Sequence, residues 1–339
     1  MDLQFFETFW FLIVGLALFV FTVLDGFDLG VGMLLPFFTK RQENRVMAIN
    51  SIWPVWDGNE LYGLIAGGAL FAIFPAVFGV ILTGFYPFVI LLLVALMYRP
   101  VSFEVWFHNI QSRRFWQAVF ALCSFGIIFL AGVVVGNTMN GISLVAGPHS
   151  GAVFNGSLFS LLQPFPLLTG LLVSAACLVH GASWMLIKFK GDAQSEARTA
   201  LSRVWTIYVV IVVAWALMFF LTLPGAAGKP LVWIFAVLLV ADMVVLRVLA
   251  GGSGEKRVFL VSTLGLGFMW AIVGAYQYPV LVRASNDAAN SITIANAGAE
   301  LSTLQFLGIV APIVLLVVAA YTVFVYRIFK GKVQADTKY

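Results

Sequence analysis

Long apolar runs alternate with short polar segments along the whole chain. A stretch of about 20 mostly apolar residues can cross the hydrocarbon core of a bilayer as an α-helix. Runs of this kind lie at 8–37, 58–76, 79–98, 117–137, 161–187, 204–223, 231–249, 258–279 and 303–329. Only a short turn near Pro75 separates the second run from the third, which leaves a count of eight open. The pattern predicts an all-α polytopic membrane protein, with a single integral membrane domain over residues 1–339 and about nine transmembrane helices.

The composition is consistent with lipid as the solvent of this fold. Hydrophobic residues make up 62% of the chain and charged residues 10%, whereas a soluble domain carries roughly 25% charged residues. The basic residues stand in short runs between apolar segments, which is a topology signal and does not indicate nucleic-acid binding. The first residues are acidic rather than basic, so we predict no removable signal peptide. Cys123 and Cys177 lie inside apolar runs and show neither metal-ligand nor disulfide spacing.

The distribution of positive charge gives the chain a direction. With nine spans, 17 of the 19 Lys and Arg residues fall on one side of the membrane, and only Lys229 and Arg283 fall on the other. Positive residues favour the cytoplasmic side, so we expect the N-terminus outside and the C-terminus in the cytoplasm. The predicted cytoplasmic segments are 38–57, 99–116, 188–203, 250–257 and the C-terminal tail.

Four acidic residues gather at the cytoplasmic ends of the first two predicted spans. Asp25 and Asp28 are three residues apart and therefore lie on nearly one helix face. Asp57 and Glu60 open the second span, and the short connection between the spans predicts that the two pairs are close in space. Charges inside spans are costly, and carboxyl groups at the edge of a low-dielectric region can exchange protons with water. We therefore interpret these residues as a proton-accepting cluster.

Structural roles are the alternatives for three of these residues. Asp57 followed three residues later by Glu60 resembles a capping box at a helix start, and the same residues could serve as a cap and as a proton site. Asp28 lies nearer the interface than Asp25, and its alternative is an ion pair with a basic residue of the following loop. The candidates for that pair are Lys40, Arg41 and Arg45.

Other polar residues inside the predicted spans favour structural interpretations. Asp242 is expected to pair with Arg247 or a neighbouring helix rather than to take part in catalysis. His180 is the histidine deep in a span, and a hydrogen bond to a neighbouring helix is favoured over ligation of a haem. His108 and His149 fall in loops, and three scattered histidines are too few to hold several haems.

Tryptophans stand at the predicted membrane interfaces. Trp53 and Trp56 precede the second span, and aromatic belts are expected at this depth. Anchoring at the interface is therefore the favoured role of both residues. Contact with a quinone or a lipid tail is the weaker alternative.

Several motifs resemble one known family. Residues 25–32, Asp25-Gly26-Phe27-Asp28-Leu29-Gly30-Val31-Gly32, are similar to the first-span signature of subunit II of cytochrome bd-type quinol oxidases. The stretches 50–60, 66–72, 98–104 and 180–182 resemble later signatures of the same family. Together with the length and the number of spans, the resemblance covers essentially the whole chain.

The resemblance implies a fold and a partner. Each of the two main subunits of this family has two four-helix bundles plus one peripheral helix. Subunit I holds two b-type haems and haem d, reduces oxygen to water, and oxidises quinol in a loop between its sixth and seventh spans. The corresponding connection here, residues 224–230, is very short, which agrees with a non-haem subunit that stabilises subunit I and binds no cofactor directly. Some members of the family also hold a structural quinone in subunit II.

The resemblance also implies a role for the acidic cluster. Subunit II of this family provides a route for protons from the cytoplasm toward haem d. Asp57 matches the carboxylate implicated in this route, and Asp25 matches an acidic residue of the same motif region. The setting implied is a bacterial or archaeal cytoplasmic (inner) membrane, with subunit I, quinol, lipid and small single-span accessory subunits as partners.

Two other functions are compatible with the same residues. A proton-coupled transporter would use the carboxylates to bind and release its ion, but such proteins tend to repeat broken helices in matching positions. No second motif like residues 25–32 is present in the C-terminal half, which disfavours this function. In a purely structural partner of a haem subunit, the acidic residues would be caps and ion pairs.

Overall fold

The computed structural model describes residues 2–108, 111–147 and 152–333. The long helices are α1 (Leu3–Phe38), α3 (Trp56–Ile73), α5 (Tyr86–His108), α6 (Arg113–Asn140), α7 (Pro164–Lys188), α8 (Gly191–Thr222), α9 (Pro230–Ala250), α10 (Glu255–Gln277) and α12 (Leu301–Ile328). The short helical elements are α2 (Gln42–Ile52), α4 (Pro75–Gly84), η2 (Leu158–Leu161), η3 (Ala226–Gly228), η4 (Ala288–Asn290) and α11 (Ile294–Ala297). The strands are β1 (Leu144–Ala146), β2 (Ala152–Phe154), β3 (Val280–Val282) and β4 (Ile292–Thr293).

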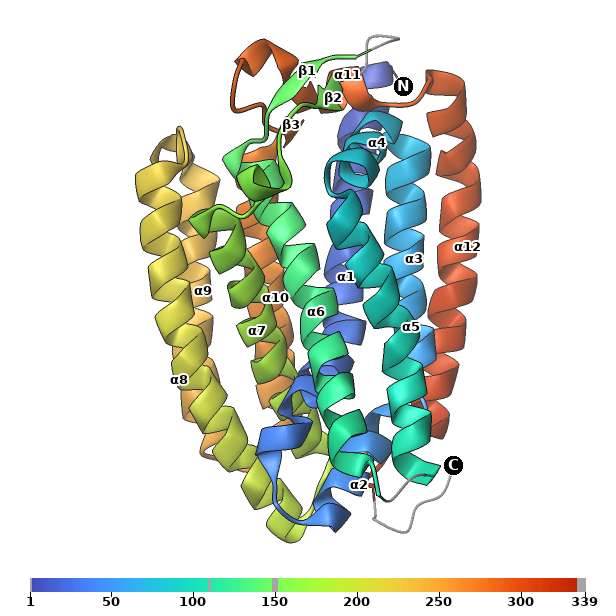
Figure 1. Cartoon of the computed structure of the whole chain (residues 1–339), viewed down its shortest axis with the longest axis vertical. Helices are drawn as coiled ribbons and strands as arrows, with labels where there is room; N and C mark the ends of the chain where they lie inside the picture. Colours follow the sequence, from blue (N-terminus) through green and yellow to red (C-terminus); the bar gives the residue numbers. More distant parts are fainter. Residues whose placement is uncertain (1, 109–110, 148–151, 334–339) are drawn as a thin grey trace.

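The long helices form two groups of four with one helix outside them (Figure 1). Helices α1, α3, α5 and α6 pack together, as do α7, α8, α9 and α10, and the groups meet where α7 packs against α1 and α6. Helix α12 runs along α3 at the edge of the molecule. In the described residues, eight helices are long and apolar enough to cross a membrane, and the bent pair of α3 and α4 makes nine. The predicted all-α membrane fold is therefore confirmed.

The boundary between the second and third predicted spans is wrong. Instead of one turn near Pro75, a separate helix α4 follows α3 at an angle of 116°, and α5 begins at Tyr86. Proline has no backbone N–H and fits the first turn of a helix, so Pro75 ends one helix and begins another. Residues 74–86 are uncharged and almost entirely apolar, and for this reason hydropathy does not separate α4 from the spans around it.

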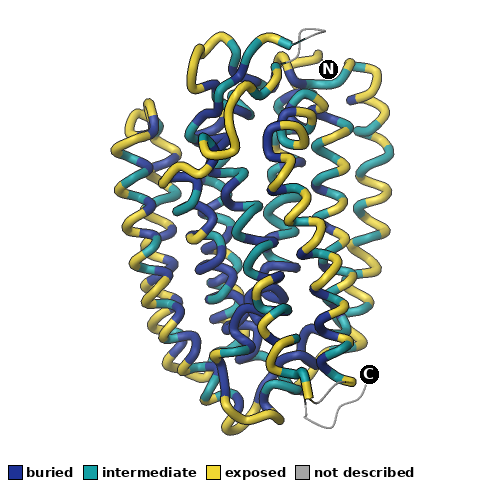
Figure 2. Tube along the Cα trace, in the orientation of Figure 1, coloured by how far each residue is buried: buried dark blue, intermediate teal, exposed yellow. Residues whose placement is uncertain are grey.

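The C-terminal half of α1 is the centre of the molecule. Residues 25–35 are buried without a break, and buried segments gather in the lower middle of the bundle (Figure 2). Glycines let α7 approach this segment closely, because a Cβ on Gly30 would lie 1.9 Å from the Cys177 carbonyl oxygen and one on Gly181 would lie 2.6 Å from the Gly30 carbonyl carbon. Side chains larger than hydrogen at Gly30 and Gly181 would therefore push α1 and α7 apart.

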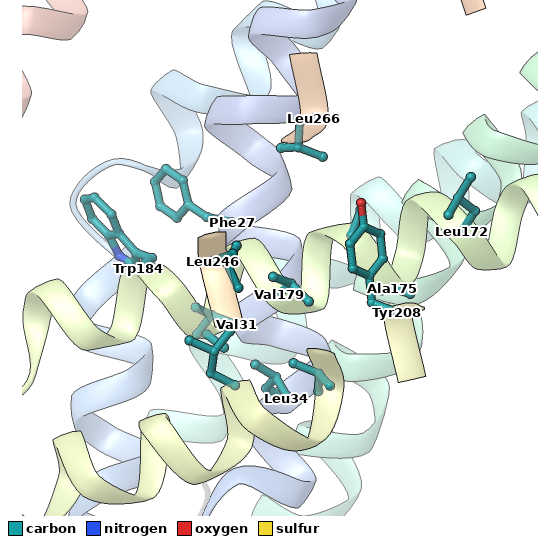
Figure 3. Close-up of a cluster of buried hydrophobic side chains, with 14 of the residues drawn as sticks. Phe27, Val31, Leu34, Leu172, Ala175, Val179, Trp184, Tyr208, Leu246 and Leu266 are labelled. Atoms are coloured by element: carbon teal, nitrogen blue, oxygen red, sulfur yellow. The ribbon is translucent and has the colours of Figure 1, made fainter. Parts of the chain in front are cut away.

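Aromatic packing joins the two groups of helices beside this crossing (Figure 3). Phe27 of α1 stacks on Trp184 of α7, with ring centroids 4.2 Å apart. Phe259 of α10 packs edge-on against Phe27 and stacks on His180 at 4.5 Å. Such ring pairs contribute about 1 kcal/mol each beyond the area they bury. Aromatic rings therefore add to the aliphatic core between the groups, in which Val31, Val179 and Leu266 also lie.

Short strands and hydrogen bonds order the end of the molecule opposite α2. Strands β1 and β2 pair antiparallel, as do β3 and β4, and a bridge between Ile142 and Ala284 joins the two connections. The Lys229 ammonium donates to carbonyl oxygens near the end of α10, among them that of Tyr278 at 3.0 Å. Burial, and then the nearby Arg283, lower the pKa of Lys229. Both basic residues predicted to lie outside the cytoplasm are in this region.

The glycine crossing leads to a stability prediction. We expect Gly30→Ala to lower the free energy of unfolding by about 2 kcal/mol or more, because the added methyl group has no space against α7. Gly67→Ala is the matched control, since a Cβ there meets nothing within 4 Å. Thermal unfolding of the purified proteins in mild detergent measures the difference. Equal unfolding temperatures for the two variants would contradict the close contact between α1 and α7 at Gly30.

Candidate functional site

Three helices of the first group bring the acidic residues together. The consecutive turns of α1 place Asp25 and Asp28 on one side of the helix, and both side chains are fully buried. Helix α3 begins at Trp56, so Glu60 lies on its second turn beside α1. The predicted proximity of the two acidic pairs is therefore correct for Asp25, Asp28 and Glu60.

A buried arginine forms the centre of the cluster. The Arg99 side chain of α5 is 2% exposed, and its Nη1 lies 3.0 Å from Asp25 Oδ1 and 3.6 Å from Glu60 Oε2. Asp28 lies near the same guanidinium. One cation therefore faces three carboxyl groups, and two negative charges would stay uncompensated if all three ionised. Buried charges need partners, so this arrangement is suited to binding and releasing protons.

Asp28 is held by an amide and not by a loop cation. Asn59 Nδ2 donates to Asp28 Oδ2 over 2.7 Å, and Tyr326 Oη of α12 donates to Asn59 Oδ1 over 2.9 Å. The alternative pairing of Asp28 with a basic loop residue is wrong, because Asp28 makes no ion pair within the described residues and two of the three candidates bind elsewhere. Arg41 pairs with Asp192 at 2.6 Å. Arg45 donates to the Thr39 carbonyl and the Gln117 side chain.

Asp57 lies at the surface end of the cluster. The side chain is exposed, whereas the side chain of Glu60, one turn further along α3, is 23% exposed. The capping-box interpretation is wrong, since Val55 is the N-cap of α3 and makes no side-chain cap hydrogen bond. Asp57, Glu60 and Asp25 therefore run from exposed through partly buried to fully buried.

Unpaired polar atoms and a small pocket accompany the cluster. Asp25 Oδ2, Asp28 Oδ1 and Arg99 Nη2 have no hydrogen-bond partner within the described protein. A pocket of only about 10 Å³ lies beside the guanidinium and is lined by Ile52, Trp56, Arg99, Pro100, Phe103 and Phe120. Buried polar atoms of this kind are where ordered water binds in proteins.

The two predicted interface tryptophans lie next to this pocket. Trp53 stacks on Phe103 with ring centroids 4.4 Å apart, and Trp56 is 6.3 Å from Trp53. Both are partly buried against the protein. Their contact with a quinone or a lipid stays a prediction.

Arg99 is the site residue that sequence reasoning missed. The residue follows an apolar run and precedes Pro100, so the hydropathy pattern places it at the start of the segment 99–116. In the structure α5 continues through Pro100 to His108, and Arg99 is inside the helix. The available signal was charge balance, because acidic residues buried in a membrane need a cation at the same depth.

His180 and Asp242 lie away from the cluster. His180 Nδ1 is 2.8 Å from Ser262 Oγ and Nε2 is 3.0 Å from the Val23 carbonyl oxygen, so the favoured hydrogen-bonded role is confirmed. Within the described residues Asp242 makes no ion pair with Arg247, whose guanidinium instead lies over the Trp205 ring. The Arg247 option is therefore wrong, and the Asp242 carboxyl instead faces the neighbouring helix α10, where a Cβ on Gly265 would lie 2.7 Å from Oδ2.

The histidines do not form a metal or haem site in the described residues. His108 lies 3.5 Å from Glu104 at the surface, and His149 lies outside the described residues. Across residues 2–108, 111–147 and 152–333, no three His, Cys, Asp or Glu side chains group as a metal site would require. The fully hydrogen-bonded imidazole of His180 does not fit an axial haem ligand in this arrangement.

The model of one protein family, "Cytochrome bd terminal oxidase subunit II", matches residues 6–329. The chain belongs to this family. Subunit II is thus a component of an oxidoreductase complex, as the motif resemblance indicated, and the transporter alternative is not supported.

Similar proteins match over nearly the whole length of this subunit II. The chain is 28% identical to "Cytochrome bd-I ubiquinol oxidase subunit 2" of Escherichia coli, covering 97% of the chain and 96% of that protein. Identity to "Cytochrome bd ubiquinol oxidase subunit 2" of Bacillus subtilis is 29%, covering 96% of each. The solved bd oxidase of Geobacillus thermodenitrificans contains a chain that matches with a TM-score of 0.76 and 15% identity, covering 96% of this chain and 98% of that one. This last likeness shows a shared fold.

The Arg99–Asp25 pair of this subunit II can be tested by stability. We expect Arg99→Gln to lower the free energy of unfolding by about 3 kcal/mol, because Asp25 would stay buried without its counter-charge. Adding Asp25→Asn should recover part of the loss, and Arg114→Gln, at an exposed position on α6, is the control. Thermal unfolding of the purified protein is the measurement. A midpoint for Arg99→Gln equal to that of the control would contradict the pair.

Proposed function

We propose that this chain is the non-haem subunit of a quinol-oxidising cytochrome bd complex and carries protons from the cytoplasm toward the oxygen-reducing centre of subunit I. Subunit I would hold two b-type haems and haem d, which supply the oxygen chemistry. Two observations support the proposal: the chain belongs to the family of cytochrome bd subunit II, and its buried cluster combines three carboxyl groups with one guanidinium. The relatives in Escherichia coli and Bacillus subtilis are described as ubiquinol oxidase subunits.

The graded burial of the carboxyl groups is the observation that carries the proton route. Asp57 is exposed, Glu60 is partly buried, and Asp25 is fully buried beside Arg99. A proton taken by Asp57 can pass inward because each next carboxyl group lies deeper in the low-dielectric core. Arg99 limits the negative charge that builds up when the inner groups release their protons.

Arg99 also supports the alternative of a purely structural subunit. The buried contact between Arg99 and Asp25 would hold α5 against α1 without any transfer of protons. The unpaired oxygens of Asp25 and Asp28 favour the transport role, because a cluster built only for stability would leave fewer polar atoms unsatisfied.

The direction of the chain is part of the proposal. Helices α1 and α12 begin at the same end of the bundle and α12 finishes at the other (Figure 1). The end that carries α2, Asp57 and most of the basic residues is then the cytoplasmic side. Quinol would be oxidised in subunit I, since residues 224–230 form here only a tight turn with η3. Stabilisation of subunit I, single-span accessory subunits and a structural quinone near Trp53 and Trp56 complete the proposed assembly.

The proton route predicts the effect of neutral substitutions. In inverted membrane vesicles that contain the full oxidase, we expect Asp57→Asn or Glu60→Gln to slow quinol-driven oxygen uptake about tenfold or more. A positioned side chain that transfers a proton typically accelerates a reaction by at least this factor. Proton uptake from the side that bears the C-terminus should slow equally. Glu104→Gln is the control, since Glu104 is an exposed acidic residue of α5 in contact with His108.

The outcome separates the two functions. Unchanged oxygen and proton uptake in both variants, with haem content preserved, would leave only the structural role for the cluster.

The proposed association with subunit I predicts a haem spectrum for the purified complex. We expect the chain, purified in mild detergent from a host that also expresses subunit I, to carry the visible absorption of b-type haem and haem d in stoichiometric amount. The physical reason is that large apolar faces of α8, α9 and α12 are exposed on the isolated chain, and part of such a surface is expected to bind a partner helix. A chain that never copurifies with haem would exclude the oxidase function.

A further inference from the structure

Helix α12 stands outside both groups of four helices, yet it closes one side of the acidic cluster. None of the residues in its most apolar stretch is buried by the rest of the chain. Its cytoplasmic turns nevertheless form a polar seam with α3. Tyr326 Oη lies 2.9 Å from Asn59 Oδ1, and the hydroxyl groups of Tyr62 and Thr322 lie 2.9 Å apart. A helix that only faced lipid would gain nothing from such groups, because lipid offers them no partners.

The seam fixes the orientation of one buried amide. Asn59 is 1% exposed, and its two ends have different partners, with Nδ2 donating to Asp28 and Oδ1 accepting from Tyr326. Without the tyrosine hydroxyl, the amide could rotate and present its oxygen to Asp28. We propose that Tyr326 is a positioning residue of the acidic cluster, which acts through Asn59 to keep a hydrogen-bond donor on Asp28 and thereby sets when Asp28 binds and releases its proton.

Two lysines fix the end of α12 against the end of α7. One belongs to α7 and binds α12, and the other follows α12 and binds the end of α7. Lys188 Nζ donates to the Phe329 carbonyl oxygen over 2.8 Å, and Lys332 Nζ donates to the Phe189 carbonyl oxygen over 2.9 Å. The Val333 amide donates in turn to the Lys188 carbonyl over 2.9 Å. Phe329 is one helical turn beyond Tyr326, so this lysine clamp determines how far Tyr326 reaches toward Asn59.

Trp184 of α7 links the clamp to the tyrosine. The Tyr326 ring packs edge-on against the Trp184 ring, with centroids 6.1 Å apart and an interplanar angle of 72°. The Lys188 ammonium lies 4.9 Å from the centroid of the same indole. The clamp, the indole and the tyrosine therefore form one packed unit on the cytoplasmic side of α12.

The charged and titratable groups that face Asp28 come from four helices. They are Asp25 on α1, Glu60 on α3, Arg99 on α5 and Tyr326 on α12. Asn59 is the neutral group that donates to Asp28. The consequence of the positioning for turnover rests on the proposed proton route, whereas the hydrogen-bond geometry does not depend on that route.

The test compares Tyr326→Phe with Tyr321→Phe in the full oxidase complex. Tyr321 is on the same helix and is 54% exposed, so the control removes a hydroxyl group without touching Asn59. Tyr326→Phe should assemble with normal haem content and move the pH of half-maximal oxygen uptake by about one unit, because the released Asn59 amide no longer keeps its donor on Asp28. Tyr321→Phe should leave the pH profile unchanged.

An infrared measurement tests the positioning role of Tyr326 independently of the proposed proton route. The carboxyl C=O stretching band that disappears in Asp28→Asn is expected to shift in Tyr326→Phe and to stay in place in Tyr321→Phe. If Asp28→Asn does not assemble, Asn59→Leu provides the reference, because both variants should shift the same band. A band that does not move overturns the positioning role whatever happens to turnover. If the band moves in Tyr326→Phe but oxygen uptake is unchanged in both Asp57→Asn and Tyr326→Phe, the positioning role of Tyr326 is supported and the proton route is excluded.

The lysine clamp is tested with a pair of lysines from the same tail. Lys332→Met removes the contact with the end of α7 and should reproduce the direction of the band shift in a weaker form. Lys330→Met, at an exposed neighbouring position, should leave the band as in the wild type. Equal spectra for the two variants would show that the clamp does not position Tyr326.

Discussion

The contact between Arg99 and Asp25 constrains the first group of helices more than any other single interaction. A charge pair at this depth is stable only if both partners stay together, because neither can be solvated by lipid. Helix α5 must therefore present Arg99 on the side that faces α1, and α1 must present Asp25 to it. The burial of α1 on every side over residues 25–35 follows from the same requirement, since an exposed face there would bring lipid to the ion pair.

The remaining polar contacts extend outward from this pair. Glu60 shares Arg99 with Asp25, and Asn59 on the same turn of α3 binds Asp28. Tyr326 then ties α3 to α12 through Asn59. The first group of helices is thus organised around charge and hydrogen bonds, and its chemistry and its packing use the same residues.

The second group of helices is organised differently. Where it meets α1, glycines at the crossing and the stacked rings of Phe27, Trp184 and Phe259 provide close contact without charge. His180 in this region is satisfied by Ser262 and by the Val23 carbonyl oxygen. This division gives the acidic cluster a rigid wall on the α7 side, while its α3 side stays open to the surface at Asp57.

Some predictions succeeded because they depend on properties that are local in the sequence. Hydropathy over about 20 residues identifies spans whatever their neighbours are, and a three-residue spacing places Asp25 and Asp28 on one face of any helix. The predictions of partners were weaker. The alternative partners of Asp28 (Lys40, Arg41 or Arg45) and the Arg247 option for Asp242 do not hold, because the sequence shows which charges are near along the chain and not which are near in space.

By itself, the sequence determined the solvent, the membrane-spanning all-α architecture, the family and the end of the bundle at which the acidic residues gather. The tertiary structure alone decided that Arg99 belongs to the cluster, since its partner is 74 residues away in the chain. It also decided that α4 is a separate helix and that α12 reaches Asn59 through Tyr326. The physical reason is that apolar runs report burial in lipid, whereas the pairing of buried polar groups depends on which helices pack side by side.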